Sequence, residues 1–298
     1  MSSLFIPVVS RCGVHRACSV RLARSVAVVA VMSVVPAAAF AQDEARQLGW
    51  KNSTELGLVV TSGNSSTTNF NVRNVFTYDW EAAELEWKFG ILRASSDDDR
   101  FALGTEDDFE IIEPDVEPDN QRLYTNIRYI RNINRRFFWY GQMFAERDEP
   151  ADIDYRLTLA GGAGNTWAKR DAFTFLTGYG VSYTAESQTL EGASGFAGYQ
   201  FFYELNMKAT DTTNIESSMT FDGSLETGSN FRFDWLNAVS VNISEKIALK
   251  ASVRLVYRND PALEEIDLEN DLGIVIGGIV LPKKKLDTAL TTALVISF

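Results

Sequence analysis

The last residues of the chain, 286–298, read "LDTALTTALVISF". They alternate with a period of two, which is typical of a β-strand whose successive side chains point to opposite faces of a sheet. The more apolar face consists of Leu286, Thr288, Leu290, Thr292, Leu294, Ile296 and Phe298. A chain terminus usually frays in water. A strand of this kind therefore needs a partner for its edge and an apolar cover for its face.

The other end of the chain has the pattern of a secretory signal peptide. Four arginines precede the apolar run 25–35, and the small residues Ala39 and Ala41 form a cleavage site before Gln42. A membrane-spanning helix needs about 20 apolar residues, and this run is shorter and ends at Pro36. We therefore expect an exported protein with a signal peptide at 1–41, a short periplasmic segment at 42–53 and one β domain at 54–298.

The expected mature chain lacks the residues that most active sites use. Cys12, His15 and Cys18 all lie within 1–41, so no cysteine or histidine follows. This excludes disulfides, Ser-His and Asp-His catalysis, and metal sites built from histidine or cysteine. Glu84 and Glu86 could in principle serve glycoside chemistry, but at this spacing they more simply share one wall. We expect no enzyme activity, no cofactor and no metal.

The charge of the expected mature chain also limits its partners. All 40 acidic residues follow residue 41, whereas four of the 28 basic residues precede it, so the formal net charge of 42–298 is −16. Nucleic-acid binding proteins neutralise phosphates with a basic surface. The sequence therefore predicts that no nucleic acid is bound.

Alternation continues along the chain, and helical periodicity is never sustained. It predicts twelve strands, at 54–62, 67–79, 83–95, 121–132, 137–147, 154–167, 172–186, 196–209, 213–224, 230–242, 246–258 and 286–298. Connections alternate between short turns and a set that includes the long loops 96–120 and 259–285. A β-sandwich also alternates, but only a membrane barrel has a reason to sort its connections in this way. We predict a transmembrane antiparallel β-barrel.

Three further features bear on this barrel. The apolar stretch 271–281 would spoil the even strand number as a thirteenth strand, so we interpret it as the wall of an outer hairpin. Trp80, Trp139 and Trp167, with Phe137 and Phe138, lie at the short-turn ends and suggest an interfacial aromatic girdle. The glycine-rich "GGAG" at 161–164 indicates a bulge or a close approach of backbones, or has no structural meaning.

Two stretches carry a family resemblance. They are "ELGLVVTSGNSSTTNFNV", residues 55–72, and "KKKLDTALTTALVISF", residues 283–298. Together they resemble the domain of unknown function 481 family, the salt-induced outer membrane proteins, over about residues 49–298. The resemblance implies an outer-membrane barrel of unestablished biochemical function, associated with salt stress, in contact with outer-membrane lipid and lipopolysaccharide. By the same analogy, Phe298 resembles the signal recognised by the barrel-assembly machinery.

Charged side chains recur on the polar faces of the predicted strands. We expect them to line the lumen: Arg73, Glu84, Glu86, Lys88, Arg122, Arg128, Glu204, Lys208, Arg232, Asp234, Lys250 and Arg254. Glu84 and Glu86 should pair with Arg73, Arg122 or Arg128 on neighbouring strands. Such pairs either seal a narrow structural barrel or line a small pore and bias which solutes pass.

The long loops offer a different hypothesis. Loop 96–120 holds eleven acidic residues against Arg100. These carboxylates could bind divalent cations that bridge to lipopolysaccharide phosphates, but no calcium-loop spacing is present, so we expect a solvated, self-repelling loop. A receptor or adhesin would act through 96–120 and 259–285.

Overall fold

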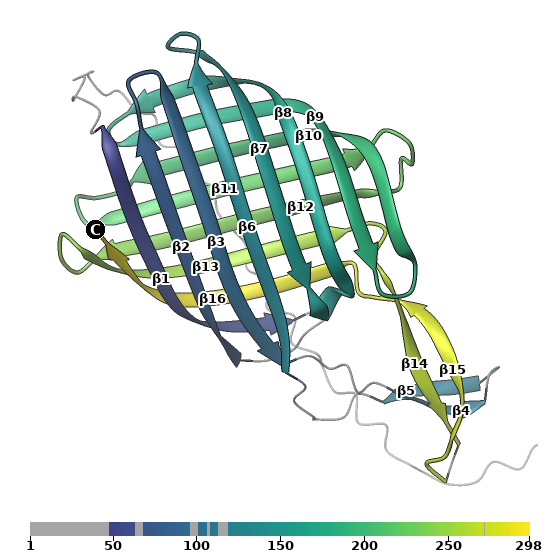
Figure 1. Cartoon of the computed structure of the whole chain (residues 1–298). Coiled ribbons are helices and arrows are strands. Elements are labelled where there is room, and N and C mark those ends of the chain that lie inside the picture. Colours follow the sequence, from purple (N-terminus) through teal and green to yellow (C-terminus); the bar gives the residue numbers. More distant parts are fainter. Residues whose placement is uncertain (1–47, 63–67, 96–100, 106–107, 113–118, 271) are drawn as a thin grey trace, which may run out of the picture. The chain divides into compact units, whose positions relative to one another are not determined.

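The computed structural model describes residues 48–62, 68–95, 101–105, 108–112, 119–270 and 272–298 (Figure 1). These residues form two sheets, a closed antiparallel barrel and a separate four-stranded sheet. The expected signal peptide lies outside the described residues. Within them, no helix is long and apolar enough to cross a membrane.

Twelve strands close the barrel, as the alternation predicted. They are β1 (Gly49–Ser62), β2 (Thr68–Asp79), β3 (Ala83–Ser95), β6 (Asp119–Asn132), β7 (Phe137–Asp148), β8 (Ile153–Arg170), β9 (Phe173–Gln188), β10 (Gly192–Lys208), β11 (Thr213–Ser224), β12 (Phe231–Asn242), β13 (Ile247–Arg258) and β16 (Leu286–Ser297). The last strand pairs with the first, with Gly57 opposite Ala293. Phe298 extends this pairing, because its N–H donates to the carbonyl of Asn52 at 2.9 Å.

The first strand begins at Gly49 rather than at Thr54, so part of the expected periplasmic segment belongs to the barrel wall. Alternation did not predict the first part of this strand, because three residues before Thr54 are all polar: Lys51, Asn52 and Ser53. Polar pairs hold it instead: Lys51 Nζ lies 3.0 Å from an Asp79 carboxylate oxygen, and the amide of Asn74 donates to the Asn52 side chain at 2.9 Å.

The second sheet has the order β15-β14-β4-β5. Its strands are β4 (Phe101–Thr105), β5 (Asp108–Ile112), β14 (Leu263–Glu269) and β15 (Val275–Pro282), and a short 3-10 helix, η1 (Glu149–Ala151), joins β7 to β8. β14 and β15 form an antiparallel hairpin. The interpretation of 271–281 as a hairpin wall rather than a barrel strand is therefore confirmed for the described residues.

Residues 96–120, which we expected to form a solvated, self-repelling loop, contain the strands β4 and β5. β4 pairs in parallel with β14 and antiparallel with β5. Its Ala102 is fully buried in a cluster with Ile266 and Leu268, against which Phe109 packs. These few apolar residues outweigh the surrounding like charges because they join a core supplied by the distant 259–285 segment.

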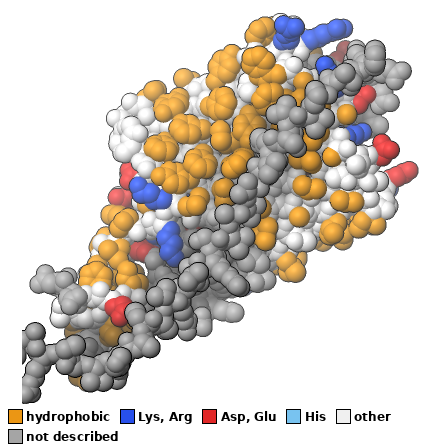
Figure 2. All heavy atoms as spheres, turned by 180° about the vertical axis from the view of Figure 1, so that it is seen from behind, with side chains coloured by type: hydrophobic (Ala, Val, Ile, Leu, Met, Phe, Trp, Pro, Cys, Tyr) orange, Lys and Arg blue, Asp and Glu red, His pale blue; other side chains and the backbone are white. Residues whose placement is uncertain are grey.

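The outer face of the barrel is apolar. Leu58, Val181 and Leu249 are at least half exposed, and Figure 2 shows hydrophobic side chains spread over the barrel wall. Aromatic rings form two rows of contacts on this face. One row lies near the short turns and runs Phe76, Trp50, Tyr78, Trp80, Tyr129 and Trp139. The other lies near the opposite ends and includes Tyr199, Phe221, Phe231, Tyr257 and Phe233.

The predicted girdle is correct for Trp80, Trp139, Trp167 and Phe137, which are exposed, and wrong for Phe138, which is buried inside the barrel. Phe138 belongs to an interior cluster with Ile130, Tyr140 and Phe202. Its alternate position along β7 turns it away from the neighbouring Phe137 and Trp139.

Glycines in β8 and β9, the strands that lie between β7 and β10, make room for this interior aromatic cluster. A methyl group built on Gly164 would overlap the ring of Phe138, and one built on Gly178 would overlap the ring of Phe202. Gly164 and Gly178 also lie opposite each other in the β8–β9 pair. At the "GGAG" stretch, therefore, the aromatic ring of Phe138 packs directly against the backbone of the barrel wall.

Candidate functional site

The lumen holds most of the buried charge of the protein. We call the end of the barrel with the short connections 80–82, 133–136, 171–172, 209–212 and 243–246 the turn side, and the other end the loop side. Alternation turns the polar face of every strand inward, and the charged residues of that face meet in the barrel interior.

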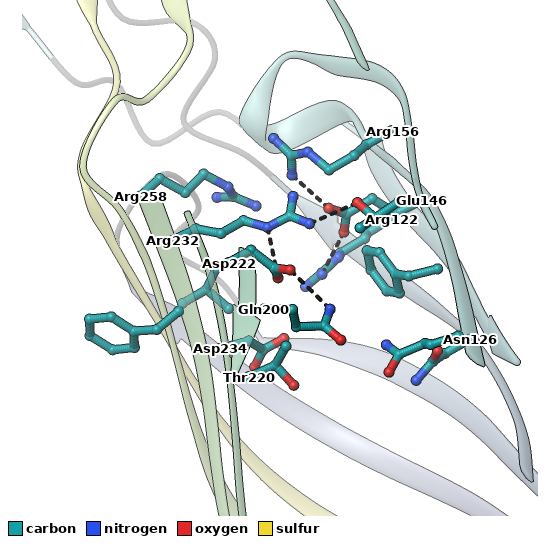
Figure 3. A pocket seen from close by; sticks show the side chains of 15 residues that line it. Arg122, Asn126, Glu146, Arg156, Gln200, Thr220, Asp222, Arg232, Asp234 and Arg258 are labelled. Carbon is teal, nitrogen blue, oxygen red and sulfur yellow. Dashed lines mark hydrogen bonds and ion pairs between the residues drawn. The ribbon is translucent and has the colours of Figure 1, made fainter. Parts of the chain in front are cut away.

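On the loop side, arginines and carboxylates form a network, part of which is drawn in Figure 3. Arg156 pairs with Glu146 at 2.7 Å and with Glu186 at 2.6 Å. Arg122 also pairs with Glu146 at 2.7 Å, and Arg258 pairs with Asp148 at 3.1 Å. All of these side chains are nearly inaccessible to solvent. Their mutual pairing compensates for the cost of burying each charge.

A second group of pairs occupies the turn-side half and the middle of the barrel. Arg128 lies 3.1 Å from Glu86 and 2.6 Å from Glu204. Lys250 lies 3.0 Å from Glu55 and 2.8 Å from Glu216. Further pairs among the described residues are Lys88 with Glu86, Arg73 with Glu55, and Arg254 with Asp234.

Some of these contacts cross the lumen instead of joining neighbouring strands. β7 and β13 lie diametrically opposite in the barrel order, yet Asp148 and Arg258 from these strands form an ion pair. Arg128 of β6 reaches Glu204 of β10, and Arg232 of β12 donates to the hydroxyl of Thr158 of β8 at 3.0 Å. The interior is therefore spanned at several depths by side chains.

Besides a cavity of about 20 Å³ beside Glu186, two larger cavities lie among these side chains in the described part of the chain. The smaller, of about 120 Å³, is drawn in Figure 3. The larger, of about 190 Å³, is lined by residues of the middle and turn-side parts of the lumen. The two cavities share the lining residues Arg122, Asn126, Gln142, Phe144, Thr220 and Asp234. They therefore adjoin, and both have room for water and polar partners for it.

Most of the predicted lumen residues do lie in this interior. Ion pairs engage Arg73, Glu86, Lys88, Arg122, Arg128, Glu204, Arg232, Asp234, Lys250 and Arg254. Glu84 is half-buried near the turn-side end of β3. Lys208 is the exception, because it is exposed at the last residue of β10, where the strand leaves the barrel.

The expected pairing is confirmed for Glu86 with Arg128, and two of the named arginines have other acceptors. Arg73 pairs with Glu55, and Arg122 pairs with Glu146. Both acceptors were missed, although each shares the inward parity of its strand. Glu55 and Glu146 each lie one residue from the end of a predicted strand, as the predicted residues Glu84 and Arg122 do, so parity would have included them.

Other missed residues form the loop-side network: Asp148, Arg156, Glu186, Gln200, Asp222, Arg258 and Asp287. They lie near strand ends or, for Gln200, carry no charge. The sequence contains a signal for them, because they stand at inward-facing positions of the alternation and charges of both signs recur at several strand ends. Among the described residues, no group of histidine, cysteine, aspartate and glutamate side chains has the arrangement of a metal site.

Solved structures with a similar fold include several membrane barrels. The translocator domain of autotransporter NalP from Neisseria meningitidis has 9% identity, covers 86% of this chain and 90% of its own, and has a TM-score of 0.46. The KdgM porin has 10% identity, coverage of 83% and 99%, and a TM-score of 0.40. An anion-selective porin from Comamonas acidovorans has 7% identity, coverage of 85% and 99%, and a TM-score of 0.38.

These values describe a likeness of barrel architecture alone. A comparison with curated proteins finds no match. The family comparison is specific, because the model described as "Protein of unknown function, DUF481" matches residues 54–298, which include all but the first part of β1 in the described barrel. The chain belongs to the DUF481 family.

Proposed function

We propose that this chain is an integral outer-membrane protein, exported by residues 1–41 and cleaved before Gln42. The support is the outer face of the barrel, which carries apolar side chains between two rows of aromatic rings. An apolar surface of this extent is unfavourable in water and is the surface that a membrane barrel presents to lipid. Sedimentation with outer membranes, and an N-terminus at Gln42 in the purified protein, test this assignment.

Within the membrane, we propose that the barrel is a narrow pore for small polar solutes and ions. One observation carries this proposal: the lumen is not filled, but contains two polar cavities that adjoin through shared lining residues. Twelve strands give a barrel between the filled eight-stranded ones and the wide porins. The crossing ion pairs would make the path narrow and its conductance small.

Recording in planar lipid bilayers tests the pore. Residues 42–298, refolded in detergent and added to the bilayer, should give discrete and small conductance steps in KCl. Silence at all voltages and salt concentrations would instead support a sealed structural barrel. The observation that favours this second candidate is the ion pair between Asp148 and Arg258, which joins opposite walls.

A surface receptor or adhesin is a further candidate, favoured by the small sheet. Leu272, Ile274, Val275 and Ile276 expose apolar side chains at and beside the tip of the β14–β15 hairpin. Replacing 263–282 by a short glycine-serine linker should abolish this function without opening the barrel.

The family resemblance suggests that the protein acts under salt or osmotic stress. Growth of a deletion strain at raised osmolarity would test this link.

A further inference from the structure

A row of hydrogen-bonded polar side chains crosses the outer face of β10, β11 and β12. Trp235 Nε1 donates to the hydroxyl of Tyr203 at 2.8 Å, and that hydroxyl lies 3.0 Å from the hydroxyl of Ser217. Ser217 in turn donates to Asn237 Oδ1 at 2.8 Å. Asn237 has the outward parity of Val239, which is 45% exposed two residues further along β12. The row is therefore a polar feature of the surface that we expect to meet lipid.

The row ends at Asn237 with an unpaired amide. Among the described residues, no group accepts a hydrogen bond from Asn237 Nδ2. By contrast, the outward amides of Asn52 and Asn74 pair with each other, because Asn74 Nδ2 donates to Asn52 Oδ1 at 2.9 Å. Asn237 lies between Phe233 of the loop-side aromatic row and the turn-side end of β12, within the apolar belt. Lipid tails offer no acceptor there, so the amide needs an acceptor from another molecule.

The surface around Asn237 lacks the aromatic rings that the barrel carries elsewhere near its turns. The turn-side aromatic row lies on β1, β2, β6, β7 and the turn after β2. From Asn237 to the end of β12, and from Ile247 to Val253 in β13, no residue is aromatic. The exposed side chains of these stretches are aliphatic: Val239, Val241, Ile247, Leu249 and Val253. Aromatic rings mark the headgroup level of a lipid-facing wall, so this aliphatic surface suits a protein partner better than lipid headgroups.

We propose that the turn-side half of β12 and β13 is the interface of a symmetric dimer in the membrane, in which Asn237 of one copy hydrogen-bonds to Asn237 of a second copy of this chain. A side-chain amide has both donors and an acceptor, so it is its own partner across a two-fold axis. The outward residues of these strand halves carry no charge, since Lys250 is buried on the inner face. Two copies therefore approach without repulsion. The inference rests on the proposed membrane location, because water would satisfy the amide of a soluble protein.

Cross-linking in outer membranes tests the dimer. Residues 42–298 contain no cysteine, so Val239→Cys places a single thiol beside Asn237. A short bis-maleimide added to isolated outer membranes should convert this variant to a band of dimer size. Leu123→Cys is the matched control, because Leu123 is 40% exposed on β6, the strand diametrically opposite β12. It should stay monomeric. A dimer band from both variants, or from neither, would overturn the proposal.

A second substitution tests the role of the amide. Asn237→Leu added to Val239→Cys should lower the yield of cross-linked dimer about tenfold, the scale expected for polar contacts within a membrane. Asn74→Leu added to Val239→Cys should leave the yield unchanged, because the Asn74 amide is paired within its own chain. Equal yields in the two double variants would refute the amide contact. Heat-modifiable migration of each variant on a denaturing gel separates loss of the dimer from loss of the fold.

The same fractions distinguish this inference from the proposed membrane location. Val239→Cys protein that is present in outer membranes but gives no cross-link would refute the dimer and keep the location. Protein that is absent from the outer-membrane fraction would refute the location and the dimer with it.

Discussion

At the scale of single residues, glycines inside the wall determine whether the aromatic cluster fits. A methyl group at Gly178 would overlap the ring of Phe202, whereas one at Gly141 would meet nothing. Gly178→Ala should therefore lower the free energy of unfolding by about 1–3 kcal/mol, the usual cost of overpacking. Gly141→Ala should be neutral or slightly stabilising. Urea titration of the refolded barrel, followed by tryptophan fluorescence, measures both, and equal midpoints would contradict this account.

The buried arginines provide a second prediction at this scale. Arg156 is buried between Glu146 and Glu186, whereas Arg147 is largely exposed and pairs with Glu149 at 2.9 Å. Arg156→Gln should destabilise the barrel by about 2–4 kcal/mol, because it leaves buried carboxylates without a partner. Arg147→Gln should change stability by about 0.5 kcal/mol or less. The same urea titration compares them, and a cost at Arg147 equal to that at Arg156 would argue against a buried network.

Sequence alone predicted the direction of most side chains but not their partners. Period-two alternation places Arg73, Arg128 and Lys250 inside the barrel, as observed. It cannot reveal contacts between strands that are not neighbours, such as Arg128 with Glu204, because these depend on barrel closure and diameter. The same alternation places Phe138 inside, opposite to Phe137 and Trp139, but the room for its ring depends on Gly164 of the paired strand.

At the scale of elements, one lysine anchors the second sheet to the barrel. Lys283 follows β15, is buried, and its Nζ donates to the carbonyl of Pro150 at 2.9 Å and lies 2.9 Å from Asp152. Lys283→Met should free the β14–β15 hairpin and speed its proteolysis while the barrel stays intact. Lys285→Met, at an exposed position, is the matched control. Cleavage rates that are equal in the two variants would refute the anchor.

The last strand allows a prediction about assembly. Phe298 is exposed, and its backbone continues the pairing with β1 through Asn52. We predict that Phe298→Ser lowers the amount of protein assembled in outer membranes of cells, because the proposed assembly signal is lost. Refolding in detergent micelles should be unaffected, since the ladder between β1 and β16 remains. Equal loss in both experiments would assign Phe298 to stability instead of recognition.

The barrel strands could be found from sequence because each is long and alternating, and most end in a short turn. β4 and β5 could not, because each has only five residues and they stand among acidic residues that favour a solvated loop. Their pairing with β14 joins segments far apart in the chain. Short strands that depend on such distant partners carry too little local signal for prediction.

At the scale of the whole molecule, closure of the barrel has a direct consequence. Every barrel strand pairs on both sides, so no strand edge of the barrel is left free. We predict that the refolded protein migrates faster than its heated form on a denaturing gel, because a closed ladder resists detergent at room temperature. Identical migration of heated and unheated samples would contradict a closed membrane barrel.

We propose that solutes pass through a lumen narrowed by ion pairs that cross it. Asp148 and Arg258 join opposite walls at the loop side, and the double variant Asp148→Asn with Arg258→Gln removes this pair without changing the net charge. Single-channel recording in planar bilayers compares it with the unmodified chain. We predict discrete steps for both proteins and larger steps for the double variant. Silence from both, or steps of equal size, would contradict the claim.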